Sequence, residues 1–233
     1  MSKTYEIVKK NTPNQYALDG DVLAIVLHTT LGAYTGAVEW LMMSPEERLK
    51  RTGTKTYSSA NAVFGRIGQI TELAPPTRAT WHAGVVYKPS QRAKAILPKY
   101  PWGTLKNPNK RTLGLEMASG YDINKDGVLE GWEKLYTPKE IKACVWYILN
   151  RIEPKTGKKF GEHNILTHFD INNQKPNLEI QRAMVIAELD RQRKAIESPV
   201  VITPEPVEPV NNIIMSIEEG GKTRKFICQP FNN

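Results

Sequence analysis

The chain has 233 residues, of which 40% are hydrophobic, and a formal net charge of +8. This length suits one sizeable core or one domain with an appendage, and the composition excludes disordered and fibrous classes. No apolar run reaches the ~18 residues of a membrane helix, and the polar start MSKTYEIVKKNTPNQ lacks the apolar centre of a secretory signal. We therefore expect a protein that stays in the cytoplasm of its producing cell or leaves by a route that the chain does not encode.

The basic charge favours a polyanionic partner, which could be nucleic acid, anionic lipid or the acidic polymers of a bacterial wall. The basic residues are scattered, and no helix-turn-helix, zinc finger or aromatic-basic signature is present, so no specific nucleic acid is expected. The two cysteines, Cys144 and Cys228, lie far apart and offer no disulfide framework. Cys144 falls in an apolar helical pattern, which indicates a buried free thiol.

The first strong element is the apolar run VLAIVLH at 22–28, which predicts a buried strand with His28 at its carboxyl end. Ser44-Pro45-Glu46-Glu47 then has the pattern of a helix start, with a capping serine, proline at the first helical position and a glutamate that completes a capping box. Short strands are expected at 59–64 and 69–74, joined by a turn at 65–68. The run TLGLEM at 112–117 predicts another buried strand, which carries one acid, Glu116.

The second half begins with a capping box from Thr137 to Glu140, followed by a helix with one apolar face as far as Ile152. A short strand at 164–167 leads into His168, and a last helix is expected from about 178 to 195. Strands mixed with helices in this order predict an α/β domain with a mixed central sheet flanked by helices, spanning residues 1–197.

Two further segments follow this domain. Residues 198–212 are rich in proline and valine and predict an extended linker. The tail, 213–233, could form a hairpin around Gly220-Gly221, although it is too short to be a stable domain by itself.

The chain has only four histidines, and two of them, His28 and His168, end apolar strands. A catalytic zinc site needs three protein ligands and an open position, and rigid strand ends can supply imidazoles. A strand-end histidine also has a purely structural alternative, so position alone does not decide. His163 lies in the polar turn GKKFGEHN and is expected to be exposed.

Six ordered motifs make the case more specific. They are VLHTT (26–30), SANAVFGRIGQITELA (59–74), WHAG (81–84), LGLEM (113–117), LYTPKEIKA (135–143) and ILTHFDINNQKPN (165–177). With them, residues 20–195 resemble the N-acetylmuramoyl-L-alanine amidase family, which includes amidase-type phage lysozymes and animal peptidoglycan recognition proteins. The resemblance implies the fold of that family and its activity, which is zinc-dependent hydrolysis of the amide between N-acetylmuramic acid and L-alanine in bacterial peptidoglycan. We also expect the protein to be a monomer. The missing secretory signal and the basic charge suit a phage-type endolysin or a virion wall hydrolase.

The resemblance also implies a metal site. His28 and His168 match two zinc ligands of the family, whereas the third ligand is normally Asp or Cys, two residues after a lysine. Here that lysine is Lys175 and the ligand position is Asn177. Asn177 offers only a neutral oxygen and could instead cap the last helix. Asp170 is a substitute ligand, although its family counterpart supports the ligands from behind.

Catalytic roles follow from the same resemblance. One branch of the family has a tyrosine as general base where this chain has Ala60; in the other branch a glutamate serves, and Glu116 matches it. The alternative for Glu116 is a strand carboxylate in a salt bridge. Lys175 matches the family lysine that stabilises the oxyanion.

Substrate contacts are expected from Thr29, Asn61, Trp81 and His82, with Asn61 standing where a histidine is common in the family. The alternative for Trp81 and His82 is a packed aromatic ring beside a hydrogen-bonded histidine.

A second cation site is suggested by DINKDGVLEGWE at 122–133, which matches a calcium-loop pattern. No clear helix enters the loop, so an acidic surface turn is the alternative. The expected Ca²⁺ ligands are Asp122, Asn124, Asp126, the carbonyl of Val128, and Glu133.

Two other functions remain open. Asn177 motivates a peptidoglycan-binding module without zinc chemistry, and the charge alone motivates a nucleic-acid-binding protein.

Overall fold

The computed structural model describes residues 4–30, 32–118, 136–197, 213–219 and 222–228. The chain divides into two compact units, Met1–Lys194 and Ala195–Asn233, which are considered separately. Within the described ranges, no helix is both long and apolar enough to cross a bilayer.

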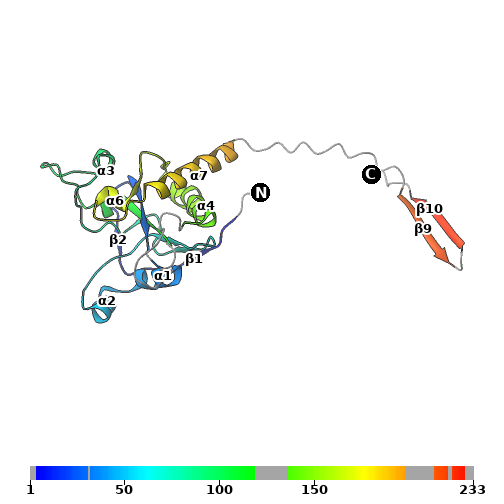
Figure 1. Cartoon of the computed structure of the whole chain (residues 1–233), viewed down its shortest axis with the longest axis horizontal. Coiled ribbons are helices and arrows are strands. Elements are labelled where there is room, and N and C mark those ends of the chain that lie inside the picture. Colours follow the sequence, from blue (N-terminus) through cyan, green and yellow to red (C-terminus); the bar gives the residue numbers. More distant parts are fainter. Residues whose placement is uncertain (1–3, 31, 119–135, 198–212, 220–221, 229–233) are drawn as a thin grey trace. The chain divides into compact units, whose positions relative to one another are not determined.

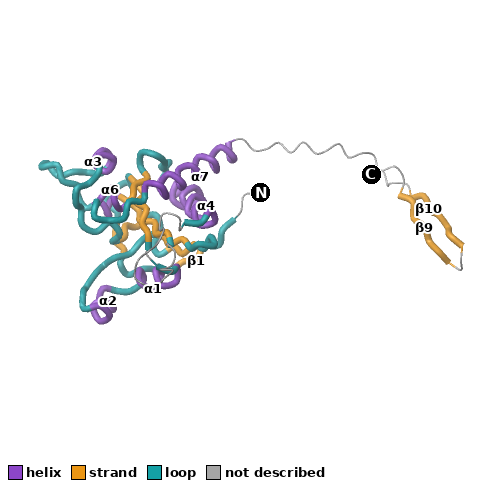
Figure 2. The backbone as a smooth tube through the Cα atoms, viewed as in Figure 1, coloured by secondary structure: helices purple, strands orange, loops and turns teal. Residues whose placement is uncertain are grey.

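A six-stranded mixed sheet forms the centre of the first unit (Figure 2). In spatial order the strands are β1 (Ile7–Lys9), β5 (Ile70–Glu72), β4 (Ala62–Phe64), β7 (Thr112–Met117), β3 (Ala24–Thr29) and β8 (Ile165–Thr167). Strand β7 runs parallel to β3 on one side and to β4 on the other. Strand β8 is parallel to β3, and β5 pairs antiparallel with β4. This confirms the α/β class with a mixed sheet.

The register of the two longest strands decides which side chains share a face. In the β3–β7 pair Leu27 stands beside Leu115, and His28 stands beside Glu116. Because alternate side chains of a strand leave opposite faces, the two leucines enter one core and His28 and Glu116 enter the other side together. Both lie where these parallel strands end.

Helices α4 (Pro138–Tyr147) and α7 (Glu179–Glu197), with the π-helical turn η3 (Ile148–Ile152), cover the leucine face and lie side by side in Figure 1. The main core forms here from branched and aromatic side chains of both layers, including a buried Cys144. The predicted capping boxes are present at Ser44, which begins α2 (Pro45–Thr52), and at Thr137, which begins α4.

Shorter elements cover parts of the opposite face. Helix α1 (Tyr34–Met42) packs on β4, whereas α3 (Gln91–Ile96) and α6 (His168–Ile171) pack near β3. The sequence did not predict several short elements, which are α1, α3, β1, a two-stranded ladder of β2 (Gln15–Ala17) and β6 (Arg78–Thr80), the 3₁₀ turn η1 (Pro108–Arg111), α5 (Glu153–Thr156) and α6.

In the second unit, β9 (Ile213–Glu219) and β10 (Lys222–Cys228) pair antiparallel, with Ile213 opposite Cys228. The division of the chain into domain, linker and tail stays a prediction.

Candidate metal and catalytic site

His28 lies at the carboxyl end of β3 and is almost completely buried. Its strand is the apolar run that the sequence predicts. Pairing with β7 on one side and β8 on the other fixes the backbone of this strand. A side chain on such a strand end is held rigidly, which is what a preorganised site requires.

His168 is the first residue of α6, directly after β8. Thr167 and Asp170 form a capping box there, and the Asp170 carboxylate also accepts hydrogen bonds from Ser90 Oγ at 2.6 Å and Arg92 Nη1 at 3.3 Å. Asp170 therefore holds α6 and its histidine in place. This use of its oxygens favours the supporting role over that of a substitute ligand.

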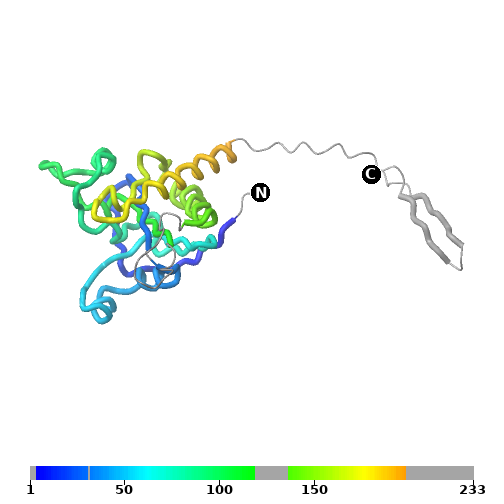
Figure 3. Tube along the Cα trace, viewed as in Figure 1, coloured from blue at the N-terminus to red at the C-terminus, as the bar shows by residue number. Residues whose placement is uncertain are grey.

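Three histidines from distant parts of the chain meet on this face. Figure 3, coloured along the sequence, shows how early and late segments such as β3 and β8 come together in the first unit. Nδ1 of His28 lies 3.0 Å from Nδ1 of His168, and Nε2 of His28 lies 3.0 Å from Nδ1 of His82. The other nitrogen of His168, Nε2, lies 2.9 Å from the carbonyl oxygen of Ala83. A carbonyl only accepts, so His168 donates from Nε2 and its Nδ1 is bare when the ring is neutral.

Burial keeps these rings neutral. It lowers the pKa of His28 far below its usual value, and the pKa of His82 to about 3 and of His168 to about 4. The positive charge of Lys175 lowers the pKa of His28 and His168 further. Neutral imidazole is the form that binds metal ions.

The spacing of the two facing nitrogens suits a shared metal ion. Zinc–nitrogen bonds of about 2.0–2.1 Å in a tetrahedral arrangement hold two nitrogens roughly 3.3 Å apart, close to the 3.0 Å between the Nδ1 atoms of His28 and His168. Among the described residues, however, no group of three His, Cys, Asp or Glu side chains is arranged to hold a metal. The two imidazoles fit zinc as a pair, and no third His, Cys, Asp or Glu side chain among the described residues completes the set.

Glu116 lies beside this pair. Its Oε1 is 4.0 Å from Nδ1 of His28, while its Oε2 is buried without a hydrogen-bond partner in the described part of the chain. Burial raises the pKa of Glu116 to about 8. A buried carboxyl group with an unpaired oxygen is unfavourable unless a cation or a reaction uses it, so its surroundings suit the general-base prediction better than a plain salt bridge.

Lys175 and Asn177 follow α6 and are both exposed. The charge of Lys175 acts on the histidines, as their lowered pKa values record. Asn177 Oδ1 accepts a hydrogen bond of 3.1 Å from the backbone N–H of Glu179, where α7 begins. The observed contact is therefore that of a helix cap, and zinc binding by Asn177 stays a prediction.

The four expected substrate contacts have different surroundings. Thr29 is half-buried at the end of β3, and Trp81 is 41% exposed, with ring contacts to Tyr16 and Tyr57. Asn61 is fully buried, and its side-chain amide forms hydrogen bonds with Gly114, Thr80 and Arg78. His82 is only 6% exposed and lies behind His28. This favours the packed alternative for His82, and neither buried residue presents a surface to substrate.

Residues that sequence reasoning did not single out support His82. Asn109 Oδ1 accepts hydrogen bonds from the backbone N–H groups of His82 and Ala83, and Thr112 Oγ1 lies 3.0 Å from His82 Nε2. One signal was available in the sequence: Gly114 interrupts an otherwise apolar strand, which often marks the close approach of another group.

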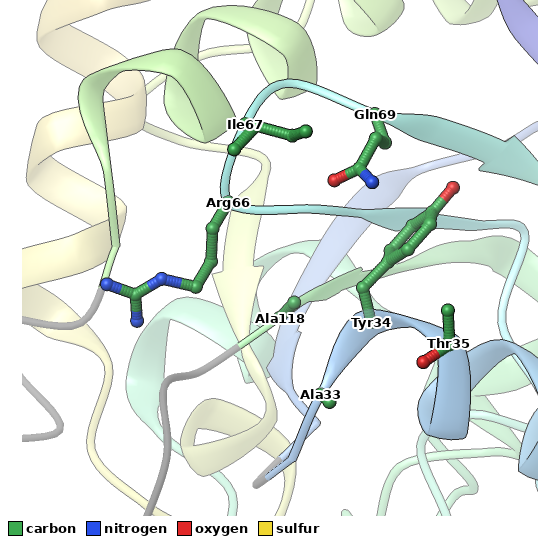
Figure 4. A pocket seen from close by; sticks show the side chains of 7 residues that line it. All are labelled: Ala33, Tyr34, Thr35, Arg66, Ile67, Gln69 and Ala118. Carbon is green, nitrogen blue, oxygen red and sulfur yellow. The ribbon is translucent and has the colours of Figure 1, made fainter.

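A cavity of about 270 Å³ lies at the same edge of the sheet (Figure 4). Its lining includes Ala33 before α1, Arg66 and Gln69 from the β4–β5 turn, and Ala118 after β7. In the close-up the Gln69 amide lies beside the Tyr34 ring, whereas the Arg66 guanidinium points away from both. The histidines and Glu116 do not line it, so it is a neighbour of the site.

His163 is exposed, as expected. The calcium loop at 122–133 lies outside the described residues and remains a prediction.

Comparisons with known proteins agree with this fold. A model of the N-acetylmuramoyl-L-alanine amidase family matches residues 18–177, more than half of the chain. Curated protein sequences give no significant match. Among solved structures, the Staphylococcus aureus hydrolase AmiA in complex with its ligand is 14% identical with a TM-score of 0.50, covering 84% of this chain and 86% of that one.

Two further structures are similar at lower scores. The N-acetylmuramoyl-L-alanine amidase LysC from Clostridium intestinale is 15% identical with a TM-score of 0.46, covering 80% of this chain and 99% of that one. Drosophila PGRP-LB is 11% identical with a TM-score of 0.47, covering 80% and 94%. At such identities, structural likeness concerns the fold. With a family model matched across both strand-end histidines, the chain belongs to the N-acetylmuramoyl-L-alanine amidase family.

Proposed function

We propose that this protein hydrolyses the amide bond between N-acetylmuramic acid and L-alanine in bacterial peptidoglycan with the help of a zinc ion. The observation that carries the proposal is the pair of facing Nδ1 atoms of His28 and His168, 3.0 Å apart, with the Glu116 carboxyl group 4.0 Å from His28. Both histidines lie inside the region matched by the family model.

His28 and His168 would hold the zinc ion. When bound, zinc polarises a carbonyl oxygen and lowers the pKa of water, which makes amide hydrolysis feasible near neutral pH. Two imidazoles leave the ion its full charge, so the third ligand decides how tightly it is held. Asn177 is the sequence prediction for that ligand, and its cap to Glu179 is the competing use of its oxygen.

Glu116 would act as general base and then as general acid. It takes a proton from the attacking water and passes it to the departing amine of L-alanine, whose bond to the lactyl carbonyl breaks. A group with a pKa near the working pH suits both halves of this transfer, and burial raises the pKa of Glu116 to about 8. A cation held at the histidines would lower that value toward neutrality.

Substrate recognition would use the exposed groups around this centre. Lys175 brings a positive charge to the developing oxyanion, and its charge already acts on His28 and His168. Trp81, with Tyr16 and Tyr57 against it, offers an exposed aromatic surface. The net charge of +8 favours approach to an acidic wall polymer, in the setting of an endolysin or a virion wall hydrolase.

The test is product analysis on purified peptidoglycan by chromatography and mass spectrometry. We expect peptides with a free L-alanine amine and glycan with a free lactyl carboxylate, with release abolished by a zinc chelator and restored by zinc. Peptides that keep their link to muramic acid, with glycan cut elsewhere, would contradict the proposed bond.

A peptidoglycan-binding module without catalysis is the second candidate, because no three-ligand group is found among the described residues. The same assay separates the two functions. If the protein cosediments with the wall but releases no peptide at any zinc concentration, it is a binding module and not an enzyme.

A further inference from the structure

His82 lies in the interior of the site, where it contacts a proposed zinc ligand and not the solvent. The ring lies across β7 at Gly114, where an added Cβ would stand 2.5 Å from Cγ of His82. Asn109 fixes the backbone of this segment, with its Oδ1 accepting from the N–H groups of His82 and Ala83 at 3.0 and 2.7 Å. The imidazole thus packs on the bare backbone of Gly114, while a buried amide holds the backbone from which the imidazole projects.

Thr112, at the end of the contact chain farthest from His28, sets the direction of the hydrogen bonds. Thr112 Oγ1 donates to the carbonyl oxygen of Pro108 at 2.9 Å, which uses its only proton. The same Oγ1 lies 3.0 Å from Nε2 of His82 and can therefore only accept there. His82 is only 6% exposed and has no carboxylate partner among the described residues, so its ring is neutral and carries its single proton on Nε2.

The chain of hydrogen bonds continues from His82 to His28. Because Nδ1 of His82 is bare, it accepts from Nε2 of His28, 3.0 Å away. His28 is also neutral, since its ring is almost completely buried. Its proton is therefore on Nε2, and Nδ1 is left bare toward the bare Nδ1 of His168. The two bare nitrogens, 3.0 Å apart, therefore direct their lone pairs at one position, where a single cation can accept both.

We propose that Thr112 and His82 are positioning residues that hold His28 in its Nε2-protonated tautomer and so keep Nδ1 free for a metal ion. The inference rests on the proposed function in taking His28 as a ligand, but the tautomer itself is a property of the metal-free protein. Groups that fix the tautomer of a metal-binding histidine typically change metal affinity by roughly 10- to 100-fold when they are removed.

The first test is nitrogen NMR of the metal-free protein with labelled histidines at neutral pH. The shifts distinguish bare from protonated ring nitrogens, and we expect His28 to be protonated on Nε2 and bare on Nδ1. A wild-type His28 protonated on Nδ1 would overturn the inference. This measurement needs no variant and no zinc, so it stands even if the protein binds no zinc and the proposed function fails.

The second test uses variants, with zinc affinity measured by competition with a chromophoric chelator. Thr112→Val removes the acceptor for His82, and His82→Leu removes the acceptor for His28. Each should mix or reverse the His28 tautomer and weaken zinc binding by roughly 10- to 100-fold. His82→Gln, whose amide can accept from His28 and donate to Thr112, should restore much of the affinity.

The matched control is Thr71→Val, which also removes a buried hydroxyl, here one bonded to Tyr34 and not to a histidine. It should leave both the tautomer and the zinc affinity unchanged. If Thr112→Val is folded and matches Thr71→Val in both measurements, Thr112 does not set the tautomer and the inference is wrong.

Discussion

Glu116 is the residue whose surroundings make the sharpest mutational prediction. Its Oε2 is buried and unpaired among the described groups, so a neutral amide of the same shape would not lose a hydrogen bond seen here. Glu116→Gln should therefore fold with unchanged or higher melting temperature. It should lower the rate of amide hydrolysis by about 10²- to 10⁴-fold, the usual effect of losing a general base.

Glu72→Gln is the matched control for that variant. Glu72 is also buried in the sheet, but its carboxylate accepts from Tyr147 at 2.8 Å and from Arg151 at 3.1 Å. Weakening this network should lower the melting temperature while hydrolysis by the folded protein continues. If Glu116→Gln kept wild-type turnover, Glu116 would be a structural carboxyl group.

Glu140 should make stability depend on pH. Burial raises its pKa from 4.5 to about 8, and its Oε1 has no described partner. The folded state therefore retains a proton that the unfolded state releases. The contribution of Glu140 to the free energy of unfolding is fully present below pH 4.5 and is lost as the pH rises through about 8. The total loss is on the order of 1 kcal/mol for each unit by which folding raises the pKa.

Glu140→Gln isolates this effect, because glutamine also serves in a capping box. Denaturant unfolding at several pH values should show a smaller loss of stability between pH 5 and pH 8 in the variant than in the wild type. Equal slopes for the two proteins would show that the Glu140 carboxyl group is not protonated in the folded state.

How much of the site the sequence could predict depends on what each residue contacts. His28, His168 and Glu116 lie at strand ends or in apolar strands, and their convergence follows from parallel strands ending at one edge. The sequence leaves His82 open between a substrate contact and a packed, hydrogen-bonded position, because its motif says nothing of depth. Its burial depends on Thr112 and Gly114, some 30 residues farther along the chain, and such contacts are fixed only by the folded sheet.

Among the elements, those with strong local signals were predicted closely. The strand at 112–117 matches β7, and both capping boxes begin helices where expected. Three-residue strands such as β1 and β6 were not predicted, since they are too short for a period to show. Helix α1 has no side-chain cap to announce its start. Such elements depend on pairing and packing with distant parts of the chain.

Gly114 gives a prediction for the β7 strand and its contact with the WHAG segment. Gly114→Ala would place a Cβ 2.5 Å from the His82 ring, so either the ring or the strand must move. We expect a loss of about 1–3 kcal/mol in the free energy of unfolding, as for other overpacked cores, together with weaker zinc binding. Denaturant unfolding and chelator competition measure the two effects.

Gly36→Ala is the control, because Gly36 lies in α1 and an added Cβ would meet nothing within 4 Å. Alanine in a helix should stabilise the protein by roughly 0.5–1 kcal/mol. If Gly114→Ala were as harmless as Gly36→Ala, the close packing of His82 on β7 would be refuted.

At the scale of the whole molecule, the proposed chemistry belongs to one unit of the chain. The residues matched by the family model, 18–177, lie within Met1–Lys194, and so do the three histidines, Glu116 and Lys175. The site joins β3, the WHAG segment, β7 and α6, so it requires the whole mixed sheet and cannot form from a local fragment.

A chain shortened to residues 1–197 should therefore keep both stability and chemistry. It retains all of α7, whose apolar residues complete the main core. We expect its melting temperature to stay within about 2 °C of the full chain, because a change of 1 kcal/mol already shifts a domain of this size by a few degrees. Hydrolysis of a soluble muramoyl peptide should be unchanged, while the effect on binding to whole walls reports what residues 198–233 contribute. A shortened chain that melts much earlier, or that loses activity on the soluble substrate, would show that the C-terminal segment supports the catalytic unit.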